Sequence, residues 1–162
     1  MADKAQLKDA LFDSLENVHA GMLSIMGSAD YPQPMSLFLD RDATCLWFIT
    51  GRDTEFFQSL KGTETAQFIV VDKSLHASLR GPIAEVHDAA KLEELWSPVV
   101  GAWFKGGKDD PNVALLRLSM EEAAIWDSTN SALMFGWEIL KANMTDGQTP
   151  DVGQFDVVRL AA

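Results

Sequence analysis

The sequence predicts an α+β protein, mainly β, built on a six-stranded antiparallel barrel with peripheral helices. Two observations carry this prediction. Apolar segments of strand length follow one another and are separated by short turn-forming stretches, which is typical of antiparallel sheets. Helical periodicity is limited to a few stretches, too few to cover a flat sheet. Six sequential strands with few covering helices therefore favour closure into a small barrel.

The composition sets the class of protein and excludes several partners. With 162 residues, 47% of them hydrophobic, the chain is expected to form one domain over 1–162 with a true core. Its 13 Lys and Arg against 24 Asp and Glu give a net charge of −11 at pH 7, which disfavours nucleic acid and anionic membranes as partners. The sequence has neither the apolar core of a signal peptide nor an apolar run of membrane length, and its single cysteine, Cys45, has no partner. We therefore expect a cytoplasmic location.

The first third of the chain changes from one helix to a series of strands. Leu7, Leu11 and Leu15 recur at helical spacing and predict an amphipathic helix over residues 4–18. The apolar segments that follow predict strands over 19–27, 33–39 and 44–50, divided by turn-forming residues. Both faces of the third strand are apolar, so we expect it to be covered on both sides.

The middle of the chain predicts a short helix and a long hairpin. Asp53 is the expected N-cap of a helix over 54–60, and Gly62 is expected to end it. Strands are predicted over 64–71 and 75–87. The pair Gly81-Pro82 inside the second strand favours a bulge or an edge, because proline has no N–H to donate to the ladder.

The last part of the chain returns to helical periodicity around two more β segments. An apolar helical stripe after Asp88, the expected N-cap, is interrupted by Ser97-Pro98, which predicts a second helix with serine as its cap. A loop is predicted over 105–111. The remaining elements are predicted as a strand over 113–120, a short extended piece over 123–127, a helix over 131–143 and a loose tail over 145–154.

The residues show no pattern typical of nucleotide binding, metal binding or nucleophilic catalysis. The glycines within 101–107 fail as a phosphate-binding loop, because Asp109 stands where Ser or Thr would bind magnesium. No Gly-x-Ser-x-Gly string marks a nucleophilic serine. No metal site is predicted, because a second ligand at suitable spacing is missing for each histidine, namely His19, His76 and His87.

Several strings of residues resemble one known family. Leu46-Trp-Phe-Ile-Thr-Gly-Arg-Asp-Thr54 resembles its flavin segment between a strand and a helix. Its downstream pattern is matched by Glu94-Leu-Trp-Ser-Pro98, Ala102-Trp-Phe-Lys-Gly-Gly-Lys-Asp-Asp-Pro111 and Ile125-Trp-Asp127. The chain is thus similar to the general stress protein branch of the pyridoxamine 5′-phosphate oxidase-like superfamily. The resemblance implies a split β-barrel that forms a homodimer and holds FMN in two clefts between the subunits.

The resemblance also implies positions that contact the cofactor. The residues beneath and beside the isoalloxazine ring would be Pro34, Met35, Ser36, Phe48, Ile49 and Thr50. Thr54, at the start of the short helix, matches a residue near the phosphate. Ser78 matches a strand position that faces the cleft. From the sequence itself, Trp126 ends a strand-like stretch, where an aromatic side chain could wall a planar ligand.

Two positions depart from the family pattern, and both affect the phosphate. Gln33 and Phe56 stand where flavin-binding members commonly carry arginine and lysine. The phosphate of FMN bears a charge of about −1.5 to −2, so a nearby cation is expected to compensate it. Arg52 is the best substitute in the sequence, with Lys61 and Arg80 as weaker candidates.

Three interpretations of the function follow. The first is an FMN-binding dimer that acts as a flavin-dependent oxidoreductase. The second is a non-enzymatic dimer on the same barrel that stores a flavin or binds another small planar ligand. The third is a cofactor-free scaffold that has lost the phosphate clamp, for which Gln33 and Phe56 are the motivating residues. No acid or base in the sequence identifies a catalytic residue or a substrate.

Overall fold

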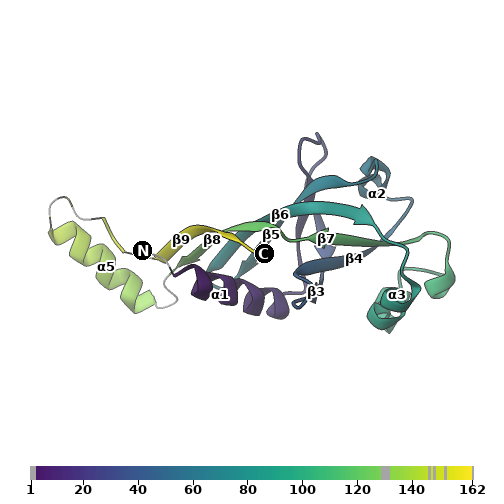
Figure 1. Cartoon of the computed structure of the whole chain (residues 1–162). Coiled ribbons are helices and arrows are strands. Elements are labelled where there is room, and N and C mark those ends of the chain that lie inside the picture. The colour runs from purple at the N-terminus through teal and green to yellow at the C-terminus, as the bar shows by residue number, and fades with distance from the viewer. Residues whose placement is uncertain (1–2, 129–131, 146, 148, 152, 162) are drawn as a thin grey trace.

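The computed structural model describes residues 3–128, 132–145, 147, 149–151 and 153–161. Figure 1 shows how the helices and strands are arranged. In chain order the elements are α1 (Lys4–Asn17), β1 (Ala20–Ile25), β2 (Gln33–Ser36), β3 (Phe38–Asp40), β4 (Cys45–Gly51), α2 (Glu55–Ser59), β5 (Glu64–Asp72), β6 (Leu75–Glu85), α3 (Ala89–Leu95), α4 (Pro98–Gly101), the 3₁₀ turn η1 (Gly107–Asp109), β7 (Val113–Ser119), β8 (Glu122–Ser128), α5 (Ala132–Met144) and β9 (Gly153–Arg159).

Nine strands of the described residues form one antiparallel sheet, which curls into a nearly closed barrel. Hydrogen-bonded neighbours follow the order β2-β1-β5-β6-β7-β4-β3, while β8 pairs with β6 and β9. β2 and β3 lie at the two ends of this path, yet they follow each other in the chain with only Leu37 between them. The path therefore bends round on itself, which confirms the predicted α+β split barrel.

The number of strands corrects the prediction of six. The segment predicted as one strand over 33–39 divides at Leu37 into β2 and β3, which join opposite ends of the sheet. The short piece predicted over 123–127 is a full strand, β8. The tail predicted as loose over 145–154 runs at its end into β9, which pairs with β8 along its whole length. Because β8 and β9 are distant in the sequence, local periodicity does not reveal their pairing.

β6 changes its partner strand at a glycine. Residues Leu75–Arg80 pair with β8, whereas Ile83–Glu85 pair with β7. Between these segments, a Cβ atom on Gly81 would overlap the backbone oxygen of Ser119, where the chain leaves β7 for β8. Glycine allows this close approach of two backbones because it has no side chain. The bulge or edge expected at Gly81-Pro82 is thus a point where one strand exchanges neighbours.

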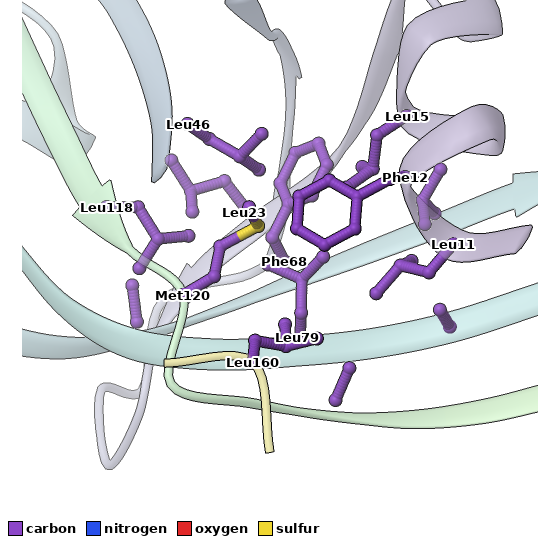
Figure 2. Packing of buried hydrophobic residues seen from close by; sticks show 14 of the residues in the cluster. Leu11, Phe12, Leu15, Leu23, Leu46, Phe68, Leu79, Leu118, Met120 and Leu160 are labelled. Carbon is purple, nitrogen blue, oxygen red and sulfur yellow. The ribbon is translucent and has the colours of Figure 1, made fainter. Parts of the chain in front are cut away.

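The interior of the barrel is apolar and is covered on one side by α1. Leu11, Phe12 and Leu15 of α1 are buried and face Phe68 in Figure 2. The other labelled members of this cluster come from the strands and from the two segments that follow β7 and β9, namely Leu23, Leu46, Leu79, Leu118, Met120 and Leu160. Burying each such large side chain contributes about 1.5–3 kcal/mol, so the helical apolar stripe docks α1 onto the sheet.

Side-chain caps fix where the short helices begin. Asp88 and Ser97 cap α3 and α4, as predicted. For α2 the predicted cap, Asp53, is wrong by one residue. The Oγ1 of Thr54 instead accepts a hydrogen bond from the Phe57 N–H at 3.3 Å, as the side chain of an N-cap residue does.

α5 stands apart from the barrel. Figure 1 shows it at the end of the molecule opposite to α2 and α3, beyond β8 and β9. Among the described residues, no strand or other helix packs along it. Within the same residues, every helix is too short or too polar to cross a lipid bilayer.

Candidate functional site

The main cleft lies where four segments of the chain meet at one side of the barrel. It has a volume of about 950 Å³. Its walls come from the end of α1 with the residues up to His19, from segment 34–39, from the end of β4 with Thr54, and from residues within 95–104 around α4. Cofactor sites are typically clefts of about 300–1,000 Å³ with mostly apolar walls, so this cleft has the size of a small-molecule site.

Two threonine hydroxyls mark one end of the cleft, and both donate their hydrogens to other atoms of the protein. The Oγ1 atoms of Thr50 and Thr54 lie 3.3 Å apart. Thr54 Oγ1 donates to the carbonyl oxygen of Gly51 at 2.8 Å. Because a hydroxyl carries one hydrogen, Thr50 is then the donor to Thr54. Neither hydroxyl has a hydrogen left for an incoming phosphate unless this arrangement is broken.

The turn that carries Thr54 is held in place by Asn112. The Arg52 N–H donates to the Asn112 carbonyl oxygen at 2.8 Å. The Asp53 N–H donates to Asn112 Oδ1 at 3.1 Å, and Asn112 Nδ2 donates to Asp53 Oδ1 at 3.0 Å. No role for Asn112 was predicted from the sequence. The available signal was an asparagine directly after Asp-Pro and before a strand, a position where asparagine side chains commonly bond to backbone.

The cleft carries little charge. Among the described residues that line it, the ionisable ones are Glu16 and His19, and neither lysine nor arginine is present. Glu16 accepts a hydrogen bond from Arg41 Nη1 at 3.1 Å, and Asp13 accepts from the same nitrogen at 3.2 Å. These bonds, that to Glu16 first, raise the pKa of Arg41 above its ordinary value. Glu16 thus shares one guanidinium with Asp13, and the cleft gains no cation from its described walls.

Arg52, the expected substitute for the missing lysine, lies outside this cleft. Its guanidinium forms an ion pair with Glu85, and its Nε donates to the carbonyl oxygen of Pro111 at 3.1 Å. The guanidinium also stacks 5.2 Å from the centroid of the Phe57 ring. Arg52 and Glu85 line a separate cavity of about 270 Å³. The arginine is thus engaged by a carboxylate away from the threonine pair.

The two positions that depart from the family pattern also lie outside the cleft walls. Phe56 is 5% exposed and packs in the hydrophobic core, so the position expected to carry lysine points away from solvent. Gln33 begins β2 and pairs with Leu23 of β1. The chain has replaced one expected cation by a core residue that stabilises the barrel.

Six of the ten residues predicted to contact a cofactor line the cleft, namely Pro34, Met35, Ser36, Ile49, Thr50 and Thr54. Phe48 points to the opposite side of β4, where it is fully buried with its ring centroid 5.5 Å from that of Phe68. Alternation along a strand explains why Phe48 and Ile49 separate. Distant segments supply walls that were not predicted, among them Val18, His19, Val99 and Trp103.

Ser78 and Trp126 are placed on the sheet away from the cleft. Ser78 lies on β6, where its Oγ accepts a hydrogen bond from Gln67 Nε2 at 2.6 Å. Trp126 lies on β8 and stacks on Phe155 with ring centroids 4.9 Å apart. The described residues bring neither side chain to the cleft of the same chain. They also contain no group of three His, Cys, Asp or Glu side chains that could hold a metal ion.

Comparisons with known proteins agree on one family. The family described as "Pyridoxamine 5′-phosphate oxidase like" matches residues 6–151. A solved structure described as general stress protein 26 from Jannaschia sp. CCS1 is 38% identical, with a TM-score of 0.79, and the match covers 96% of this chain and 99% of that one. The general stress FMN/FAD binding protein from Xanthomonas citri is 32% identical, with a TM-score of 0.70 and coverage of 79% and 92%.

A third solved structure, a general stress family protein from Xanthomonas campestris pv. campestris, is 35% identical with a TM-score of 0.72. That match covers 81% of this chain and 93% of the other. No curated protein matches the chain. The similarity therefore rests on the family pattern and on solved structures.

Proposed function

Because the chain belongs to the pyridoxamine 5′-phosphate oxidase-like family, in its general stress protein branch, we propose that it is a homodimer whose main cleft binds a flavin, FMN. The observation that carries this proposal is the cleft itself, a space of about 950 Å³ between segment 34–39 and the end of β4. The similarity to a protein described as FMN/FAD binding supports the choice of ligand.

The part of the cleft beside β2 fits a flat ring system. β2 ends the hydrogen-bonded path of the sheet, so one of its edges has no strand neighbour among the described residues. Such an edge offers backbone N–H and C=O groups, which can pair with the polar rim of an isoalloxazine ring. Met35 and Ile49 supply apolar contact from neighbouring walls. A bound flavin would supply redox chemistry, while these residues would bind and orient it.

The phosphate part of FMN fits less well. The described walls hold neither lysine nor arginine, and the hydroxyls of Thr50 and Thr54 donate within the protein. A hydrogen bond to a charged group contributes about 1.5–3 kcal/mol, which corresponds to about a tenfold or larger factor in affinity. We therefore expect FMN to bind less than about tenfold more tightly than riboflavin. The isoalloxazine ring is expected to provide most of the binding free energy.

A second candidate function is a cleft for an uncharged planar ligand, or a scaffold without a cofactor. The observation that favours it is the loss of both expected cations, at Gln33 and Phe56, while the substitute Arg52 is paired with Glu85. The two candidates differ in the ligand and share the fold. Flavin binding distinguishes them directly.

The test is to purify the chain, record its absorbance and titrate the stripped protein with FMN and with riboflavin. The proposal predicts saturable binding of both flavins, close to one per chain. Protein that is colourless and binds neither flavin would refute it and leave the cofactor-free scaffold. Anaerobic mixing of the loaded protein with NADH or NADPH then separates an oxidoreductase, whose flavin is reduced, from a storage protein, whose flavin stays oxidised with both donors.

A further inference from the structure

α5 exposes an apolar surface along which no strand or other helix of the described residues packs. All its described side chains are exposed or half-buried. The large apolar ones include Phe135, Trp137, Leu140 and Met144, with exposures of 48%, 59%, 51% and 78%. A helix of this composition is normally buried against another surface.

The charges on α5 do not compensate for this exposure. Lys141 Nζ bonds Glu138 Oε1 at 3.0 Å, so the helix carries a neutral pair in a chain with a net charge of −11. The Asp151 N–H also donates to Glu138. A lipid surface is disfavoured as the occupant, because anionic headgroups repel an acidic chain. A protein surface with few charges is the favoured complement.

The cleft offers such a surface on the same chain. Val99 and Trp103, at and just after α4, line the cleft and are 74% and 82% exposed. Exposed tryptophans of this kind are characteristic of interfaces, where they contribute more binding free energy than most residues. Among the described residues, α5 and the cleft thus each carry an exposed apolar surface, the first convex and the second concave.

The arrangement of the elements prevents α5 from covering its own cleft. Figure 1 places α5 at one end of the molecule and α3 at the other, and Leu95, the last residue of α3, lines the cleft. In a second copy turned by a two-fold axis perpendicular to the line from α5 to α3, the two ends exchange places. This brings each α5 to the end of the other copy that carries the cleft, so that two equivalent contacts can close one dimer.

We propose that α5 of each subunit packs on Val99 and Trp103 of the other and completes the wall of its cleft. This rests on the homodimer proposed above. An aromatic side chain buries about 150–250 Å², so Phe135, Trp103 and Trp137 of both copies supply several hundred square ångströms before the aliphatic residues are added. Specific interfaces begin at about 1,200 Å², which the two symmetric contacts together with neighbouring surface can reach.

Chemical cross-linking between two singly substituted chains tests the contact. Val99→Cys is made in one chain and Leu140→Cys in another, and both positions are exposed. The two variants are mixed without flavin so that their subunits exchange, and the mixture is then treated with a bis-maleimide. The native Cys45 is fully buried and serves as an internal control for unwanted reaction. We expect a covalent dimer in the mixture and little or none with either variant alone.

A second measurement reports on the dimer itself. Trp137→Glu is expected to shift the protein to monomer in analytical ultracentrifugation, whereas Tyr31→Glu, at a residue that is 90% exposed outside the cleft and α5, is expected to leave it dimeric. A dimer that gives no cross-link between positions 99 and 140 would overturn the α5 contact and leave the homodimer standing. A monomeric parent chain would overturn both. Flavin binding is measured separately, so its failure would not be confused with either result.

Discussion

Replacing Gly81 by alanine tests the strand exchange that shapes this barrel. A Cβ at this position would overlap the Ser119 backbone oxygen, and it would lie 3.2 Å from the Glu121 nitrogen. The Glu121 N–H bonds the Arg80 carbonyl oxygen at 3.0 Å, so these backbone atoms are tied to β6 and have little freedom to move. Overpacking destabilises a protein by about 1–3 kcal/mol, and each weakened backbone hydrogen bond removes up to about 0.5–1.5 kcal/mol of stability. We expect the free energy of unfolding to fall by about 3 kcal/mol.

Urea and thermal unfolding measure this change. For a chain of this length, a loss of about 3 kcal/mol lowers Tm by about 6–12 °C. The matched control is Gly136→Ala in α5, where an added Cβ meets nothing within 4 Å. Alanine there is expected to leave stability unchanged or to raise it, by up to about 1 kcal/mol. If Gly81→Ala unfolds at the same urea concentration as the parent, the close crossing of β6 and the β7–β8 connection is refuted.

Three further predictions concern the surroundings of the cleft. Arg52→Ala is expected to lower the free energy of unfolding by less than about 1 kcal/mol, because the ion pair of Arg52 with Glu85 is partly exposed. In titrations, the affinity of this variant for FMN is expected to stay within about twofold of the parent. A tenfold loss of affinity would instead identify Arg52 as the phosphate ligand. Asn112→Ala removes two side-chain hydrogen bonds to Asp53 and is expected to destabilise the protein by about 1–3 kcal/mol in urea unfolding, with Asn112→Asp losing at least as much, because its carboxylate would face that of Asp53; an unchanged midpoint would show that the turn does not depend on it. Hydrogen bonds from the backbone N–H groups of Asn112, which has the larger effect, and of Gly106 lower the pKa of Asp110 below its ordinary value of 3.8. The stabilisation of the folded protein by the charged Asp110 carboxylate is therefore complete above that ordinary value, and it is lost as the pH falls through the lower folded-state pKa. Asp110→Asn is therefore expected to be less stable than the parent at neutral pH, with the difference vanishing in acid; a difference that grows toward acid would contradict this assignment.

Local patterns in the sequence predicted most of the elements. The spacing of Leu7, Leu11 and Leu15 specifies the buried face of α1, and Ser97-Pro98 specifies the start of α4, because both signals act within a few residues. The pairing of β8 with β9 and the division at Leu37 depend instead on which distant strands become neighbours. No local period encodes that choice.

The candidate site was predictable only in part for the same reason. Met35, Ile49 and Thr54 were identified through the resemblance and line the cleft. Val99 and Trp103 lie on a helical stripe that is consistent with core packing, and the fold is needed to show that they stay exposed beside β2 and β4. The environment of Arg52 was equally hidden, because its partner Glu85 belongs to a strand far along the chain.

An FMN titration that compares a blocked cleft with a matched surface change tests the central claim most directly. Ser36→Trp fills the cleft beside β2, whereas Thr63→Trp adds the same side chain at an exposed bend outside the cleft. Binding at the cleft predicts that Ser36→Trp lowers FMN affinity by about tenfold or more, with unfolding unchanged, and that Thr63→Trp binds as the parent does. Equal FMN affinity in the parent and both variants would show that flavin, if bound, does not occupy this cleft.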